Sequence, residues 1–144
     1  YILAKCREAV AAIEKGLDAY DTPGACQAVS DFFEVLNNWY IRRSKERFWN
    51  EGGAQTDLAA YNTLYTVLVT MCRAAAPLLP LTLEAVYEGL TNENSVHLST
   101  LPSSRGAEVN EANHSNDSDE LMRGMDRVRD ACNAVLSVRN KENI

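Results

Sequence analysis

The chain has 144 residues, of which 46% are hydrophobic, and its formal net charge at pH 7 is −6. A chain of this length and composition can bury a core of its own, so we expect a single domain over residues 1–144. The negative charge argues against strong non-specific binding of nucleic acid, and the short, interrupted apolar runs argue against a membrane span.

Apolar residues spaced three and four apart predict a first amphipathic helix from residue 1 to about residue 17. Its apolar face consists of Ile2, Cys6, Val10, Ile13 and Leu17. A second helix is expected to begin at Thr22 as its cap, with Pro23 in the first helical position. It should continue to about Trp49, because the glycine pair at residues 52–53 ends helices.

A third helix is predicted from residue 58 to the prolines at positions 77 and 80, with Thr56 or Asp57 as its cap. Its buried line is expected to be Leu58, Tyr61, Tyr65, Leu68, Cys72 and Ala75. A short fourth helix should follow, capped by Thr82 and packed through Leu83, Val86 and Tyr87. Residues 95–98 fit either a short extended piece or one irregular turn.

Residues 99–118 are rich in Ser, Asn, Glu and Gly, which predicts a mobile loop. Asp117 or Ser118 should cap the last helix, because acidic residues suit its N-terminal end. Its core face is expected to be Leu121, Met125, Val128, Cys132, Val135 and Leu136. The predicted fold is therefore all-α, a helical bundle of about five helices with a mobile loop before the last one.

No residue pattern points to catalysis or to a metal. The sequence holds no glycine-rich phosphate loop, no G-x-S-x-G and no H-E-x-x-H, so we expect no catalytic residues and no cofactor in this chain. The four cysteines form no Cys-x-x-Cys pair, which argues against a zinc site. Buried free thiols in a reducing cytosol are the expected state of Cys6, Cys26, Cys72 and Cys132.

The end of the second predicted helix is basic. Its cations fall within six positions and are followed by two aromatic residues; the run comprises Arg42, Arg43, Lys45, Arg47, Phe48 and Trp49. A helix that leaves the core and ends in cations and rings suits a partner that carries phosphates. Arginine grips phosphate oxygens in a fork, and an indole ring offers a face for a base.

Helical spacing separates these cations into two sets. Arg43 and Arg47 continue the apolar line of the preceding turns, so they are expected at the edge of the core. They would either cover apolar surface and pair with a carboxylate of a neighbouring helix or hold phosphates. Arg42, Lys45 and Trp49 share another side, which is either a solvated face or a contact surface.

Residues 37–49, Asn-Asn-Trp-Tyr-Ile-Arg-Arg-Ser-Lys-Glu-Arg-Phe-Trp, resemble the segment that marks the anticodon-binding helical domain of isoleucyl-tRNA synthetases. Residues 58–68 resemble the next helix of that family, and residues 76–81 resemble its proline-bounded turn. Residues 95–98 resemble the short segment that follows. The resemblance covers nearly the whole chain, with nothing specific in residues 105–118.

The resemblance implies a cytoplasmic, monomeric synthetase, of which this chain is one non-catalytic domain beside the rest of the synthetase chain. The parent enzyme would use ATP to join isoleucine to its tRNA, and this domain would bind the anticodon arm. Phosphates would be held by Arg42, Arg43, Lys45 and Arg47, and an unstacked base would rest on Trp49. The family often has arginines in place of Lys45 and Glu46, so this copy is less basic.

Three other functions stay open at this point. Valyl- and leucyl-tRNA synthetases share the helical architecture with looser versions of residues 37–49. A scaffold module that binds no RNA would use its arginines only to brace helices. An independent small enzyme is disfavoured because no catalytic constellation is present.

Overall fold

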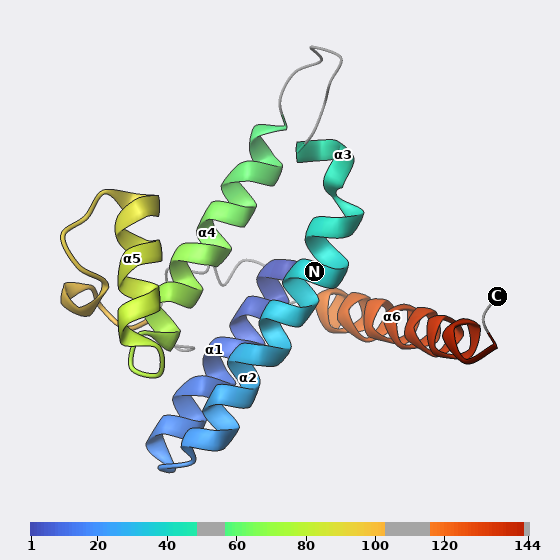
Figure 1. Ribbon diagram of the computed structural model, residues 1–144, viewed down its shortest axis with the longest axis horizontal. Coiled ribbons are helices and arrows are strands. Elements are labelled where there is room, and N and C mark those ends of the chain that lie inside the picture. Colours follow the sequence, from blue (N-terminus) through green and yellow to red (C-terminus); the bar gives the residue numbers. More distant parts are fainter. Residues whose placement is uncertain (49–56, 103–115, 143–144) are drawn as a thin grey trace. The chain divides into compact units, whose positions relative to one another are not determined.

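The computed structural model describes residues 1–48, 57–102 and 116–142 (Figure 1). These residues form helices joined by turns and contain no strand, which confirms the all-α prediction. In chain order the elements are α1 (Ile2–Asp18), α2 (Thr22–Glu34), the π-helix η1 (Val35–Ile41), α3 (Lys45–Phe48), α4 (Leu58–Ala75), α5 (Pro80–Thr91), the 3₁₀ turn η2 (Val96–Leu98) and α6 (Asn116–Glu142). The count exceeds the predicted five because the second predicted helix is divided into α2, η1 and α3.

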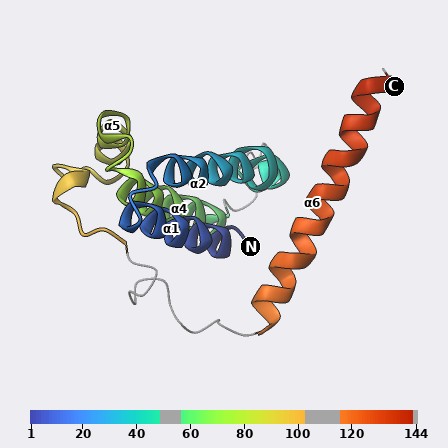
Figure 2. The ribbon, with the colours of Figure 1, turned by 90° about the horizontal axis from the view of Figure 1, so that it is seen from below.

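The chain divides into two compact units, residues 2–108 and residues 109–144 with Tyr1. In the first unit α1 lies along α2 and α4, and α4 lies along α5 (Figures 1 and 2). The core of this unit is built around large side chains with at most 1% of their surface exposed: Ile13, Leu36, Val67, Met71 and Tyr87. The prediction of one domain over residues 1–144 stays a prediction.

Small residues let α1 and α2 approach closely. A Cβ added at Gly16 would lie 3.0 Å from the Cβ of Ala25, which is fully buried. The turn between the helices places Tyr20 in the left-handed region with φ of 57°. The predicted cap of α2 is wrong by one residue, because Asp21 rather than Thr22 caps the helix, and its Oδ1 accepts a hydrogen bond from the Gly24 amide at 3.0 Å.

The predicted cap of α4 is confirmed, but its predicted buried line is partly wrong. Asp57 is the N-cap, and its Oδ1 accepts a hydrogen bond from the Ala60 amide at 3.1 Å. The side chains that are buried along the whole helix are Ala60, Val67, Met71, Cys72, Ala74 and Ala75. Leu58, Tyr61 and Tyr65 are exposed instead. Counted at 3.6 residues per turn, the face that α4 turns to the core is rotated by roughly a quarter turn from the predicted line.

The prolines act as predicted at the end of α4, but α5 starts earlier than expected. Leu79 is its N-cap and Pro80 its first residue, so the predicted cap Thr82 lies inside the helix. The helix ends at Asn92, whose φ of 57° is left-handed. The expected packing of α5 is confirmed for Leu83 and Tyr87, which are buried, whereas Val86 is exposed.

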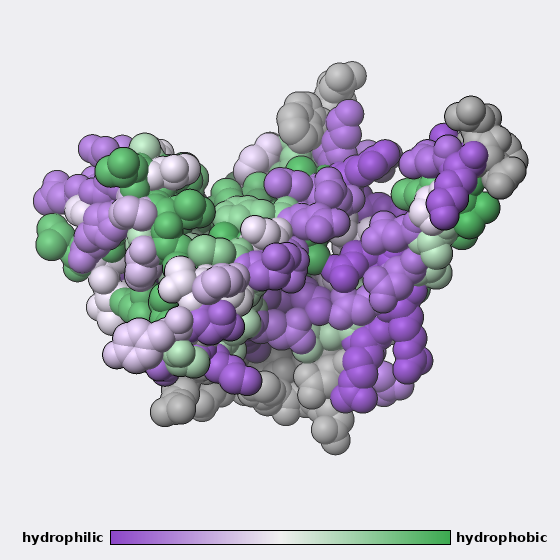
Figure 3. Space-filling view, turned by 60° about the horizontal axis from the view of Figure 1, so that its bottom comes forward, coloured by the Kyte–Doolittle hydropathy of each residue, from purple (hydrophilic) through white to green (hydrophobic). Residues whose placement is uncertain are grey.

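The turn η2 is attached to α5 by side-chain hydrogen bonds. The Val96 amide donates to Glu84 Oε2 at 2.8 Å, and the Tyr87 hydroxyl donates to the Glu93 carboxylate. The Ser95 hydroxyl, followed by the Val96 amide, lowers the pKa of Glu84 by hydrogen bonding. Hydrophobic side chains also gather on the surface over α5 and η2 (left in Figure 3). Leu81 of α5 and Leu98 of η2 are 87% and 82% exposed.

The second unit contains the long helix α6, which begins at Asn116. Both predicted caps, Asp117 and Ser118, therefore lie within the helix, and residues 116–118 of the predicted loop are helical. Most of that loop, residues 103–115, lies outside the described residues. The predicted core face of α6 does not form a core within its own unit, because most of its members are exposed: Leu121, Val128, Val135 and Leu136.

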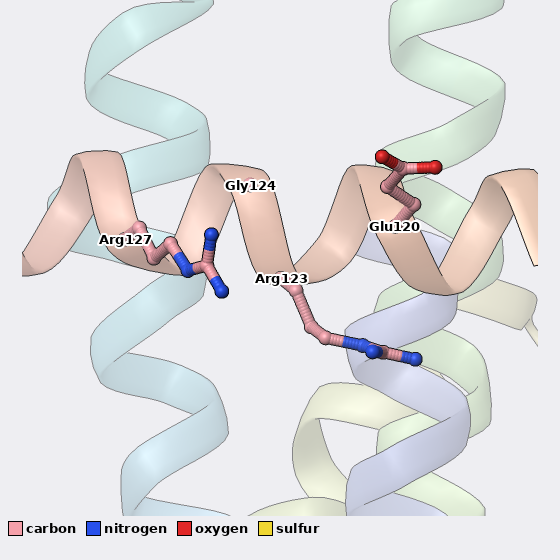
Figure 4. Close-up of a pocket in the computed structure, with 4 residues that line it drawn as sticks. All are labelled: Glu120, Arg123, Gly124 and Arg127. Atoms are coloured by element: carbon pink, nitrogen blue, oxygen red, sulfur yellow. The ribbon is translucent and has the colours of Figure 1, made fainter.

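The described part of α6 carries one shallow depression, lined by Glu120, Arg123, Gly124 and Arg127 (Figure 4). These residues follow one another along a single helix, and their side chains do not converge on one point. A ligand pocket buries most of its ligand. This depression therefore offers no binding site.

The four cysteines are free, as predicted, but they are not all buried. Burial raises the pKa of Cys6 to about 12, and burial also raises the pKa of Cys72. Cys26 is exposed, because it lies on the outward side of α2. No helix among the described residues is long and apolar enough to span a membrane, and no cluster of ligating side chains among them could hold a metal ion.

Candidate nucleic-acid interface

The basic segment is carried out of the core by a π-helix. Leu36, at the start of η1, is only 1% exposed, and the chain from there to Ile41 makes the wide turns of a π-helix. Such turns are rare and often occur at functional sites. They also change the direction of every later side chain, because the angle between successive residues is smaller than in an α-helix. The expected helix is continuous as far as Arg43 and is interrupted by a turn at Ser44 before α3, while its expected end at Trp49 lies outside the described residues.

Trp39 lies in the π-helix and is not among the buried core residues. Its side chain is half-buried, and the guanidinium carbon of Arg43 lies 4.6 Å from the centre of its ring. A cation at this distance over an indole face is attracted by the ring. Arg43 is therefore exposed and directed along the helix surface, and the prediction that it lies at the core edge is corrected.

Arg42 and Lys45 project into solvent. Both side chains are exposed, and neither makes a hydrogen bond or ion pair with any residue that the structure describes. Ser44 forms a turn between them, with its amide donating to the Tyr40 carbonyl at 2.9 Å. We call residues 42–48 the basic tip. Trp49, the remaining predicted contact, lies outside the described residues.

Arg47 braces the tip against the neighbouring helix. Its Nε donates to Asp57 Oδ2 at 2.7 Å, and the other oxygen of Asp57 caps α4. The hydrogen bond from Arg47, followed by the one from the Ala60 amide, lowers the pKa of Asp57. Asp57 in turn raises the pKa of Arg47. The sequence left two roles open for Arg47, pairing with a carboxylate of a neighbouring helix or holding phosphates. The structure supplies that carboxylate, Asp57, and so favours the first role.

A row of aromatic rings completes the attachment of the tip. Phe48 packs edge-on against Tyr40 with ring centres 6.4 Å apart and against Tyr61 at 5.3 Å. The Tyr61 hydroxyl donates to the Phe48 carbonyl at 2.9 Å. Burial raises the pKa of Tyr40, while the nearby Arg47 acts in the opposite direction. These contacts hold the tip against the N-terminal end of α4 and leave its remaining cations outside.

The structure therefore brings together Arg42, Arg43 and Lys45 as exposed cations on one short stretch. The sequence predicts Asp57 only as a helix cap and does not predict its ion pair with Arg47. An aspartate at a helix start beside a basic segment could have indicated this second contact. It also missed the π-helix, for which no residue pattern was recognised. The arrangement can hold phosphates electrostatically, and within the described residues it offers no group for chemistry.

The bracing of Arg47 leads to a testable expectation. Asp57→Ala should destabilise the chain more than Arg47→Ala, because it removes both the helix cap and the ion-pair partner. A double-mutant cycle by urea denaturation should show coupling between the two positions. Asp21→Ala, which removes a cap without such a partner, should show no coupling to Arg47→Ala.

The same pair sets the sign of a pH effect. The folded pKa of Asp57 is lowered, so its contribution to stability is complete above the ordinary carboxyl pKa of about 4 and is lost as the pH falls toward the folded pKa. The difference in unfolding free energy between wild type and Asp57→Ala should therefore shrink below about pH 4. A constant difference down to pH 2 would contradict the ion pair.

Comparison with known proteins agrees with this geometry. Residues 1–144 match the family described as anticodon-binding domain of tRNA ligase. The chain is 46% identical to an isoleucine–tRNA ligase of Wolbachia pipientis wMel, with all of this chain and 12% of the relative aligned. It is 45% identical to that of Corynebacterium efficiens and 43% identical to that of Bifidobacterium longum, with all of this chain and 13% of each relative aligned.

The chain thus spans about an eighth of the length of these relatives. The match over every residue, together with the all-helical fold and the exposed cations of the tip, leads to one conclusion. This chain belongs to the family of anticodon-binding domains of tRNA ligases.

Proposed function

We propose that this chain binds the anticodon arm of tRNA as one domain of an isoleucine–tRNA ligase. In this proposal Arg42, Arg43 and Lys45 hold backbone phosphates, Arg47 positions the tip through Asp57, and Trp49 stacks on a base. The parent enzyme would use ATP to join isoleucine to its tRNA in the cytoplasm, as a monomer. The domain itself would need no cofactor and catalyse nothing.

The observation that carries the proposal is the exposure of three cations at the end of a helical segment whose middle, at Phe32 and Leu36, is buried in the core. The domain is acidic overall, but charges separated by more than about 10 Å are largely screened at ordinary salt. An approaching phosphate therefore responds to the local sign. Four cations and one acid lie between residues 42 and 47. Within the described residues, Arg47 is the one cation among them that forms an ion pair with a carboxylate.

A scaffold that binds no RNA is the second candidate. The Arg47–Asp57 pair favours it, because this arginine braces a helix as such a scaffold requires. Arg42 and Lys45 do not fit it, because they contact no acid among the described residues. The likeness to several isoleucine–tRNA ligases favours an isoleucine-specific parent over a valyl or leucyl one.

A salt titration tests the proposal. Binding of the 144-residue chain to a fluorescent anticodon stem-loop of isoleucine tRNA should weaken as monovalent salt rises from about 50 to 200 mM. Three phosphate contacts predict a slope of log K against log salt of about −2 to −3. A stem-loop with a valine anticodon should bind more weakly. Absence of binding at low salt, or a slope near zero, would overturn the proposal.

A further inference from the structure

A strip of exposed apolar side chains runs along the N-terminal half of α4. Leu58, Tyr61 and Tyr65 are 69%, 43% and 46% exposed, and their spacing of three and four places them along one side of the helix. We call these residues the α4 strip. Contacts with Phe48 explain the position of Tyr61, whereas no contact within the described part of the first unit explains the exposed ring of Tyr65.

The α4 strip begins where the basic tip is attached. Asp57, the residue before Leu58, accepts the hydrogen bond from Arg47, and the Tyr61 ring lies 5.3 Å from that of Phe48. Tyr65 follows Tyr61 by one turn. The strip and the basic tip are thus neighbours, because α3 and α4 are in contact within one unit.

The two tyrosines differ in what their hydroxyl groups do. The Tyr61 hydroxyl donates to the Phe48 carbonyl, so Tyr61 holds the tip in place. The Tyr65 hydroxyl makes no hydrogen bond with any residue in the described part of the chain. Tyr65 is therefore available as a ring face, and removing its side chain should leave the core intact.

We propose that Tyr65 is a stacking platform for an unpaired base of the anticodon loop, while the basic tip holds the adjoining phosphates. This inference rests on the proposed tRNA-binding function and adds a second ring to the single one that the sequence predicts. Single-stranded RNA is recognised by splayed bases that stack on aromatic side chains beside a positive surface. Both features are present here: a half-exposed ring on α4 and three exposed cations in the basic tip, whose last helix, α3, contacts α4.

Substitutions at Tyr65 test the platform. Stacking of one base on an aromatic ring is worth about 1–3 kcal/mol, so Tyr65→Ala should weaken binding of the anticodon stem-loop about 10-fold at fixed salt. Tyr65→Trp should restore or exceed wild-type affinity, because it keeps a ring. The salt slope should not change, because no phosphate contact is lost. A fully paired RNA hairpin of equal charge should bind Tyr65→Ala and wild type alike.

Tyr20 provides the matched control. It is 94% exposed in the turn between α1 and α2, at the opposite end of α2 from η1 (Figure 1). Tyr20→Ala should leave stem-loop binding unchanged, and circular dichroism should show equal helix content in both alanine variants.

The outcomes separate the two proposals. Unchanged binding by Tyr65→Ala, with a steep salt slope retained, would overturn the platform and leave the tRNA-binding function standing. Equal losses by Tyr65→Ala for the loop and for the paired hairpin would also overturn it, since they would point to an altered tip. If the wild-type chain binds no stem-loop at low salt, both proposals fail.

Discussion

Replacing both Arg42 and Lys45 with glutamate is expected to weaken binding of the anticodon stem-loop by about 100-fold or more at low salt. Hydrogen bonds to charged groups contribute about 1.5–3 kcal/mol each, and the new carboxylates would also repel phosphate. The slope of log K against log salt should become shallower by about two units, because two contacts are lost. Fluorescence anisotropy at several salt concentrations measures both quantities.

A second double variant controls for the change in net charge. Lys15 and Lys141 are exposed cations outside the basic tip, and Lys15→Glu with Lys141→Glu alters the total charge by the same amount. This variant should bind the stem-loop nearly as well as the wild type does, because it leaves every cation of the basic tip in place. Equal losses in the two double variants would mean that total charge rather than the tip governs binding.

Leu36→Ala is expected to lower the free energy of unfolding by about 3 kcal/mol. Leu36 is 1% exposed at the first turns of the π-helix, and it packs in the main core cluster. Truncating Leu36 removes apolar contacts and leaves a cavity between the core and η1, the element that precedes the basic tip. Urea denaturation followed by circular dichroism should show a lower midpoint with little change of slope.

Leu81→Ala is the matched control, because Leu81 is 87% exposed at the start of α5. The same chemical change there should alter the unfolding free energy by less than about 0.5 kcal/mol. Similar effects at the two leucines would show that Leu36 is not buried in solution, and the description of the π-helix as rooted in the core would then be wrong.

Much of the secondary structure could be read from residue spacing alone. The residues Ile2, Cys6, Val10 and Ile13 are buried as their spacing predicts. Their helix has a single apolar face, so only that face can pack against the core. The cap at Asp57 and the break at Pro77 and Pro80 follow from local hydrogen bonding and ring geometry. These features depend on neighbours within a few residues, which a sequence displays directly.

The core face of α4 could not be found in the same way. Its apolar residues cover more than half of the helix circumference, so spacing allows several lines. The helices that pack against α4 determine which of these lines is buried. Val67 and Met71 are buried, and Tyr61 and Tyr65 are exposed. The same limitation affected α6, whose apolar spacing predicted a core face that its own unit does not supply.

By itself, then, the sequence determined the helical class, the family likeness of residues 37–49 and the presence of cations at one end of a core helix. Only the tertiary structure decided which of those cations remain exposed. Arg43 lies over the ring of Trp39, and the approach of α4 supplied Asp57 to Arg47, leaving Arg42 and Lys45 in solvent. The physical reason is that a side chain's partner is set by helix pitch and by elements distant in sequence, whereas its charge is set by its identity alone.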